Sequence, residues 1–411
     1  MPLRRELLGL CLGLLTVAAF ATNIKIPSLE IATSIYNNGS ELVMFTKAQM
    51  DMVVEGGYKF GGRVVFGFDG FLFYPDSAQF MPQLSFKAAG LTVRNLFDAP
   101  LSFSYFVGEN DYVCYGDDFV RLFGTTYLQS NYQASYEVII DNTVSPPVTY
   151  FYNYKGLHRI NGNGIKLEYS SPDEPFGFAW YLYHDHNFAY SFLTPGSPVN
   201  FNVLYFDTGY YSSDLRVFLN FQGFKFEGFV GGTINSENAE LGMRCGSLFY
   251  FGVDDVNFLL VAGLPALNSH TAFDLSLFYI LFEARVSLGP VTIIPTVFFR
   301  PSWYLQKDNT DLTHVTTSEA NRIDFNLNLS IFNPRRDLIS FGLEGNLQTK
   351  DLLTSPSAQF HLFVLPYITL ATPGVYWDIK VAFPLMFSNL FLSLEHIFSH
   401  AVGLINIRAE F

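Results

Sequence analysis

The stretch Met50–Asp69 alternates between apolar and polar side chains over its whole length. Its even positions are Met50, Met52, Val54, Gly56, Tyr58, Phe60, Gly62, Val64, Phe66 and Phe68, whereas Asp51, Glu55, Lys59, Arg63 and Asp69 are all odd. Successive side chains of a strand point to opposite faces, so one face is apolar and the other carries the charge. Soluble proteins usually have strands of about five or six residues. We therefore predict one unusually long strand here.

The same rhythm recurs along the rest of the chain. It is clearest in Arg322–Phe332 and Asp337–Gln348, which are joined by the Asn-Pro-Arg-Arg turn at 333–336. Asn and Pro favour turn geometry, so these two runs predict a hairpin. Further alternating runs include Asn131–Asp141, Val148–Tyr154, Phe176–His186 and Val375–Phe383. We predict an all-β protein of about sixteen antiparallel strands, with a range of fourteen to eighteen.

The composition indicates where such strands would lie. Aromatic residues make up 17% of the chain and charged residues only 15%, yet the mean hydropathy is just +0.21. Alternation explains this combination when half of each strand faces lipid and half faces water, as in a closed transmembrane β-barrel. A secreted β-sandwich would carry more charge on its outer face. The formal net charge of −13 argues against nucleic-acid binding, which needs a basic surface.

The N-terminus has the pattern of an export signal. Arg4 and Arg5 precede an apolar run from Leu7 to Phe20, and Ala19-Phe20-Ala21 offers a small-x-small cleavage site. We expect residues 1–21 to be a signal peptide and 22–411 to form the barrel. The later apolar stretches are broken by Gly, Pro or charge before about 18 residues, too soon for a membrane-spanning helix.

The C-terminus carries a family resemblance. The last residues, AVGLINIRAEF, alternate with Gly403, Ile405, Ile407, Ala409 and Phe411 in one phase. This resembles the final strand of Gram-negative outer-membrane β-barrels, which end in Phe and are read by the barrel-assembly machinery. The resemblance implies an outer-membrane location in a diderm bacterium and a porin-like channel for passive diffusion of small polar solutes or ions. It also implies contact with membrane lipids and allows a homo-oligomer.

The same resemblance predicts how the connections are distributed. Barrels of this kind have short periplasmic turns and long outside loops. The polar stretch Gln306–Asn321 should lie outside, and the turn at 333–336 should be periplasmic. Asn389–Phe398 has no strand slot in this scheme. Either it belongs to an outside loop, with Leu390, Leu394, Ile397 and Phe398 on one helical face, or the strand count is wrong.

One early stretch, Gly108–Gly124, breaks the alternation and is acidic. General porins fold a similar loop into the lumen, where acidic groups face a basic wall and set the pore width. By resemblance, the candidate constriction residues are Glu109, Asp111, Asp117, Asp118 and Arg121. An ordinary exposed loop is the alternative, although its apolar residues need cover.

The phase of the alternation also selects candidate pore-lining charges. A basic side chain facing lipid near the midplane costs about 2–4 kcal/mol, so charges on strands should face the lumen or lie near a rim. The candidates are Glu55, Lys59, Arg63, Arg322, Asp324, Glu344, Asp378, Lys380 and Arg408. They either meet the solute or neutralise one another across the lumen.

Other chemistry is weakly indicated. His184-Asp185-His186 is the one dense cluster that hints at metal binding or catalysis, and Cys114 and Cys245 could pair in an oxidising compartment. Aromatic residues near strand ends, among them Tyr181 and Tyr183, suggest interfacial girdles. We predict no enzymatic activity, metal or cofactor. The open alternatives are a transporter for a hydrophobic ligand with a partly apolar, plugged lumen, a scaffold with binding loops, and an outer-membrane hydrolase.

Overall fold

A computed structural model describes residues 23–409 apart from 38–41, 75–76, 126–129, 135–136, 142–147, 153–155, 172, 187–208, 237–240, 254, 269–276, 301–321, 333–337, 351–358 and 388. The predicted signal peptide, its cleavage site and Phe411 lie outside these residues. The first described residue, Asn23, already belongs to a strand.

Long antiparallel strands make up most of the described chain. The first half has β1 (Asn23–Asn37), β2 (Leu42–Gly56), β3 (Phe60–Tyr74), β4 (Ser77–Val93), β5 (Leu101–Val113), β8 (His158–Ser170), β9 (Phe176–Asp185), β10 (Tyr210–Phe221) and β11 (Phe224–Asn235). The second half has β12 (Leu241–Val253), β13 (Val256–Asn268), β14 (Tyr279–Leu288), β15 (Val291–Arg300), β16 (Arg322–Ile331), β17 (Ile339–Lys350), β18 (Gln359–Thr372), β19 (Val375–Phe387) and β21 (Val402–Ala409).

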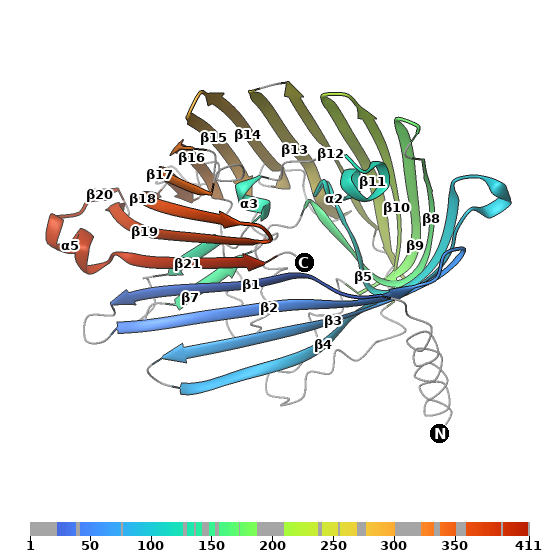
Figure 1. The fold of residues 1–411 in the computed structure, drawn as a ribbon, viewed down its shortest axis with the longest axis horizontal. Helices are drawn as coiled ribbons and strands as arrows, with labels where there is room; N and C mark the ends of the chain where they lie inside the picture. The colour runs from blue at the N-terminus through green and yellow to red at the C-terminus, as the bar shows by residue number, and fades with distance from the viewer. Residues whose placement is uncertain are drawn as a thin grey trace.

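These strands close into a ring of 18, in which each strand pairs with its neighbours in chain order (Figure 1). The ring closes where β1 pairs with β21, from Leu29 opposite Ala409 to Tyr36 opposite Val402. This pairing joins the first and last strands, whose open edges would otherwise leave backbone groups unpaired in hydrocarbon at several kcal/mol each. Between β4 and β5 the described pairing covers only Ala88–Val93, opposite Phe103–Gly108. The predicted fold class is confirmed, but the barrel has 18 strands rather than about sixteen.

The long strand predicted over Met50–Asp69 is wrong: the structure divides it between β2 and β3. The chain turns at 57–59, where Gly57 adopts a φ of +89° that a residue with a Cβ rarely accepts. Glu55 lies opposite Arg63 and Val53 opposite Val65, so odd positions face odd positions across the hairpin. A three-residue turn thus keeps the alternation in phase from one strand into the next. The sequence pattern alone therefore does not reveal it.

Two other predicted strands also differ. Asn131–Asp141 and Val148–Tyr154 contribute a short helix, α3 (Asn131–Ala134), and a separate two-stranded hairpin of β6 (Glu137–Asp141) and β7 (Val148–Tyr152). This hairpin does not pair with the barrel strands in the described structure. Both runs lie in the long connection between β5 and β8.

The two faces of the barrel wall differ in polarity. On β10 and β11 the outward side chains include Leu215, Val230 and Ile234, all 40–51% exposed, while Arg216 and Glu227 face inward and are fully buried. The same division runs along β16 and β17, where Phe325, Leu327 and Leu343 face outward. An apolar outer face around a closed antiparallel ring is the arrangement of a barrel that spans a bilayer.

The connections are unequal at the two ends of the barrel. At one end, the short-turn end, the strands are joined by two residues at 222–223, 254–255, 289–290 and 373–374. The start of β1 at Asn23 and the end of β21 at Ala409 also lie there, because the strand number is even. At the other, the long-connection end, lie 114–157, 186–209, 301–321 and 388–401. The short-turn end is the periplasmic one by the rule for such barrels. Gln306–Asn321 and the turn at 333–336, whose sides were predicted, lie outside the described residues.

The described helices are short. They are η1 (Leu96–Asp98), α2 (Asp117–Phe123), α3 and α5 (Leu394–Ser399), with the two-residue strand β20 (Leu390–Phe391) before α5. The helical alternative for Asn389–Phe398 is therefore confirmed over its second half. Among the described residues, no helix has the length and apolar character needed to cross a membrane.

Candidate functional site

Residues 114–125 and 130–134, here called the inserted segment, lie inside the ring of strands with α2 and α3 (Figure 1). The segment enters the lumen after β5. Apolar residues of α2 explain why it stays there: Phe119, Leu122 and Phe123 are buried in one cluster with inward-facing Phe106, Phe218 and Phe229 of the wall. The rings of Phe119 and Phe218 meet edge to face at 6.0 Å. Burial of this apolar surface holds α2 against one side of the barrel.

A buried arginine on β10 forms the first polar anchor of the inserted segment. The guanidinium of Arg216 is fully buried and pairs with Asp118 of α2 and, at 2.8 Å, with Glu227 of β11. It also donates to the backbone carbonyl of Tyr112 at 3.2 Å and to the hydroxyl of Tyr181 at 3.3 Å. Two carboxylates and two neutral acceptors therefore surround one charge, as a buried cation requires.

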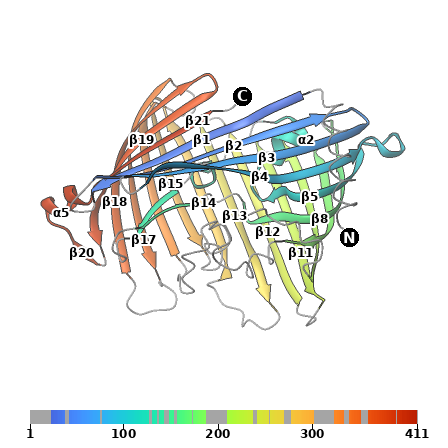
Figure 2. The same cartoon turned by 90° about the horizontal axis from the view of Figure 1, so that it is seen from below.

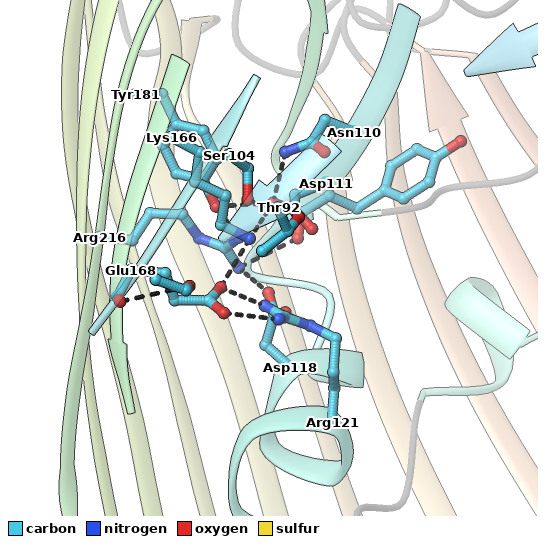
Figure 3. Close-up of polar contacts among 12 residues, drawn as sticks. Thr92, Ser104, Asn110, Asp111, Asp118, Arg121, Lys166, Glu168, Tyr181 and Arg216 are labelled. Carbon is cyan, nitrogen blue, oxygen red and sulfur yellow. Dashed lines mark hydrogen bonds and ion pairs between the residues drawn. The ribbon is translucent and has the colours of Figure 1, made fainter. Parts of the chain in front are cut away.

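A second set of charges extends this anchor toward the short-turn end (Figure 3). Arg121 of α2 makes a two-pronged contact with Glu168 of β8, at 2.8 and 2.9 Å, and also pairs with Asp118. Lys166 bridges Glu168 at 2.6 Å and Asp111 at 2.8 Å. Paired, bidentate contacts of this kind fix geometry as well as charge. The α2 helix is thus tied to β5, β8 and β10 together.

The far end of the inserted segment is anchored to a different part of the wall. The hydroxyl of Ser130 donates to Glu283 on β14 at 2.6 Å. The ring of Tyr132 packs on Phe298 of β15 at 5.2 Å, and its hydroxyl accepts a 3.3 Å hydrogen bond from Asn346 of β17. The two described parts of the segment therefore contact the inner wall at β8–β11 and at β14–β17.

Cys114 marks the point where the segment enters the lumen. Its backbone N–H donates to Glu227 at 2.8 Å, and its side chain is fully buried. Burial, with the neighbouring Glu227 carboxylate, raises the pKa of the Cys114 thiol well above its usual value. Cys245 lies on the outward face of β12, and both cysteines are free. The two thiols lie on opposite faces of the wall, so they do not form the disulfide that the sequence allowed.

A third buried network lies nearer the long-connection end. Arg244 of β12 contacts both oxygens of Asp214 on β10, at 2.7 and 2.8 Å. The hydroxyl of Tyr183 donates to the same carboxylate at 2.6 Å and lies 3.3 Å from the ring of His158. Tyr181 and Tyr183 thus face the lumen, which corrects their assignment to a membrane-interface girdle. Their hydroxyl groups instead form hydrogen bonds with the buried charged side chains.

The wall formed by β16–β19 and β21 is lined differently and is here called the polar wall. Lys380 of β19 lies 3.2 Å from both Glu344 and Asp378. The hydroxyl of Tyr367 donates to Asn328 at 2.6 Å, and its ring covers Gly342, where a Cβ would lie only 2.2 Å away. Amide side chains on β16, β17 and β21 continue this surface, namely Asn326, Asn328, Asn346 and Asn406.

These features together are those of a barrel with a segment folded into its lumen. The chain is a transmembrane β-barrel with a porin-like architecture. An even, closed antiparallel ring with short turns at one end is the outer-membrane type.

Among known proteins, solved structures match this chain, whereas family models and curated sequences do not. Solved structures match over nearly the whole chain at low identity: OmpF of Salmonella typhi in complex with daunomycin has 8% identity and a TM-score of 0.44, covering 94% of this chain and 97% of that one. OprD of Pseudomonas aeruginosa has 8% and 0.48 over 95% of both chains. OccAB3 of Acinetobacter baumannii has 10% and 0.49 over 95% of this chain and 99% of that one.

The five candidate constriction residues do not form one group in this porin-like barrel. Glu109 and Asp111 belong to β5, where they pair with Arg159 and Lys166 of β8 at 2.9 and 2.8 Å. Asp118 and Arg121 are on α2 and bind the wall, while Asp117 is exposed on the same helix. Glu109, Asp111, Asp118 and Arg121 therefore hold the inserted segment or neighbouring strands.

The candidate pore-lining residues fall into three groups. Glu55 and Arg63 lie next to the β2–β3 turn and Lys59 is within it, so this group is at the short-turn end; Glu55 pairs with Lys25 there. Asp324 is fully buried beside Arg300, and Arg322 opens β16 at the long-connection end. Glu344, Asp378 and Lys380 face inward on the polar wall, and Arg408 lies opposite Glu30 and Tyr376 in the closing strand.

Several residues that matter most were not singled out from the sequence. Arg216, Asp214, Lys166 and Glu168 carry the contacts to the inserted segment and its neighbouring network, yet only the phase of their strands hinted at an inward direction. Extending the phase argument to every charge on β8 and β10 would have found them. The contacts themselves depend on where residues 114–134 fold.

The histidine cluster does not converge on a site. His184 points outward from β9, where its ring packs on Tyr211 at 4.3 Å, while Asp185 points inward and accepts a hydrogen bond from Ser212 at 2.8 Å. Within the described part of the chain, no group of three or more His, Cys, Asp or Glu side chains is arranged to hold a metal ion.

Proposed function

We propose that this barrel is a passive outer-membrane channel for small polar solutes or ions, with the polar wall as its conducting side. The observation that supports this most is the division of the lumen. The inserted segment packs on the inner surface of β8–β15 through buried aromatic and charged side chains. The inward face of the polar wall carries the polar groups of Lys380, Tyr367 and Asn328, next to apolar side chains such as Leu365 and Leu404. A pore lined in this way replaces part of the hydration of a polar solute.

Charge on the polar wall should give the channel a weak preference for cations. Glu344 and Asp378 share Lys380, which leaves one more acid than base in that trio. Charges that line a narrow, low-dielectric passage raise the local concentration of the opposite ion.

A transporter for hydrophobic ligands is the main competing proposal, because part of the lumen is apolar and plugged. That apolar surface is already covered by Phe119, Leu122 and Phe123 of the chain itself. It therefore offers a hydrophobic ligand no site unless α2 leaves. The polar-solute channel needs no such step.

Planar-bilayer recordings of the purified full chain test the proposal. We expect large, steady openings, and a reversal potential in a KCl gradient that indicates weak cation preference. Lys380→Met should strengthen that preference and Glu344→Gln should weaken it, whereas the outward-facing substitution Ile379→Val should leave it unchanged. A purified protein that gives no channel openings would overturn the proposed channel function. Unchanged selectivity in both charge variants would overturn the role given to the polar wall.

We also propose that Phe411 and the closing strand direct assembly in the outer membrane, and that the surrounding partner is membrane lipid. The alternating apolar face of Gly403–Phe411 supports the first part, and the apolar outer face supports the second.

A further inference from the structure

The connection between β19 and β21 carries an apolar surface that the barrel does not cover. Leu390, Phe391, Leu394 and Phe398 are 71%, 78%, 75% and 68% exposed, more than the outward residues of β19, such as Ile379 and Val381 at 37%. Exposed large side chains gathered in one short segment mark a surface that contacts something. These four residues on β20 and α5 are here called the α5 patch.

The α5 helix is amphipathic in a simple way. Leu394 and Phe398 are four residues apart and share one face with Ile397, while Glu395, His396 and Ser399 occupy the other. Ser393 caps the helix by accepting a hydrogen bond from the backbone N–H of His396 at 3.4 Å. The helix therefore presents one apolar side and one polar side, as a helix at a membrane surface does.

The direction of this segment is fixed by hydrogen bonds to the barrel. Asn389, with a φ of +70°, turns the chain after β19, and its side-chain oxygen accepts the backbone N–H of Phe360 on β18 at 2.9 Å. Asn389 returns its own N–H to the carbonyl of Phe360 at 3.2 Å, and Leu392 donates to the carbonyl of Leu385 at 3.0 Å. The α5 patch is thus held beside the ends of β18 and β19, where Figures 1 and 2 show α5 beyond the strand ends.

The patch continues the lipid-facing surface of the barrel. The ring of Phe398 meets that of Phe383 edge to face at 5.8 Å. Phe383 belongs to the outward row of β19 with Trp377, Ile379 and Val381. It is the ninth residue of β19 counted from the short-turn end, and a transmembrane strand needs roughly 9–11 residues. Phe383 therefore lies near the outer boundary of the hydrocarbon layer, and α5 begins where that layer ends.

From this continuity we propose that α5 and β20 lie in the outer leaflet of the surrounding membrane, with the α5 patch against acyl chains and Glu395, His396 and Ser399 at the headgroups. The occupant is lipid because the neighbouring surface on β19 already faces lipid. The segment then widens the contact of the barrel with the outer leaflet at the strand next to the closing seam between β21 and β1. This interface is independent of conduction through the lumen.

Spin labelling of the full chain in phosphatidylcholine vesicles tests the proposal. With Cys11, Cys114 and Cys245 replaced by Ser, a nitroxide is attached in Leu394→Cys and, separately, in Glu395→Cys, which lies on the polar side of the same helix. The native Cys245, labelled in a Cys11→Ser, Cys114→Ser protein, serves as the lipid-facing reference. Accessibility to oxygen, which partitions into lipid, is compared with accessibility to a water-soluble nickel chelate.

We expect the oxygen-to-nickel ratio at position 394 to exceed that at 395 several-fold and to approach that of the Cys245 label. Equal ratios at 394 and 395 would place α5 in water and overturn the proposal. Low accessibility to both reagents at 394 would also overturn it, in favour of a second copy or another protein covering the patch. Phe398→Cys repeats the measurement if Leu394→Cys does not give the heat-modifiable gel mobility of a folded barrel.

Discussion

The buried charge of Arg216 provides the sharpest test of how the inserted segment is held. Replacing Arg216 by Met keeps most of the side-chain volume but removes the cation between Asp118 and Glu227. Both carboxylates are buried, and removing one partner from a buried ion pair costs about 3–5 kcal/mol. When α2 leaves the wall, the carboxylate of Asp118 becomes hydrated. We therefore expect the loss of the ion pair to favour departure of the inserted segment from the wall rather than unfolding of the barrel.

The native thiol of Cys114 reports that departure directly. It is fully buried where the segment enters the lumen, and its raised pKa keeps it protonated, so it should react slowly with a water-soluble maleimide. The protein carries Cys11→Ser and Cys245→Ser to remove the other two thiols. If the reaction follows the open population, a loss of 3–5 kcal/mol raises its rate by roughly a hundredfold or more at about 1.4 kcal/mol per tenfold.

Two further variants decide the interpretation. Asp118→Asn and Glu227→Gln, added to Arg216→Met, remove the stranded charges and should restore most of the slow reaction. Lys25→Met breaks an exposed ion pair with Glu55 and should change stability by at most about 1 kcal/mol. A Cys114 rate in Arg216→Met that equals that of the parent would refute the anchor. A triple variant as reactive as the single one would show that packing, not stranded charge, was lost.

Two other predictions concern the wall and its assembly. Gly342→Ala places a methyl group 2.2–2.5 Å from ring atoms of Tyr367 and should lower the free energy of unfolding in urea by about 1–3 kcal/mol. Gly345→Ala, whose new methyl group would have its nearest neighbour 4.0 Å away, should leave that free energy unchanged. Equal urea midpoints for the two variants would contradict the packing of Tyr367 on Gly342. Phe411→Ala should lower the fraction of heat-modifiable barrel recovered from outer membranes, and wild-type recovery would remove the terminal Phe as an assembly signal.

The alternation of side chains in the sequence was sufficient to predict a closed barrel. Strands with one face toward water and the other toward lipid can pair all their backbone groups in a membrane by closing into a barrel. Arg322–Phe332 and Asp337–Gln348 were located within about two residues, since each strand is long and its turn contains Pro. The same signal missed the β2–β3 turn. There the three residues at 57–59 keep odd positions facing inward on both strands, so the pattern runs on without a break.

Only the tertiary structure decided which inward charges meet. The sequence marked Asp118 and Arg121 as members of a loop, but their partners Arg216 and Glu168 lie 98 and 47 residues further along the chain. Period-two alternation fixes the face of a side chain and says nothing about its neighbour across a lumen. That neighbour depends on strand number, on register and on the path of residues 114–134. Those in turn follow from packing Phe119, Leu122 and Phe123 against the wall, which no local pattern encodes.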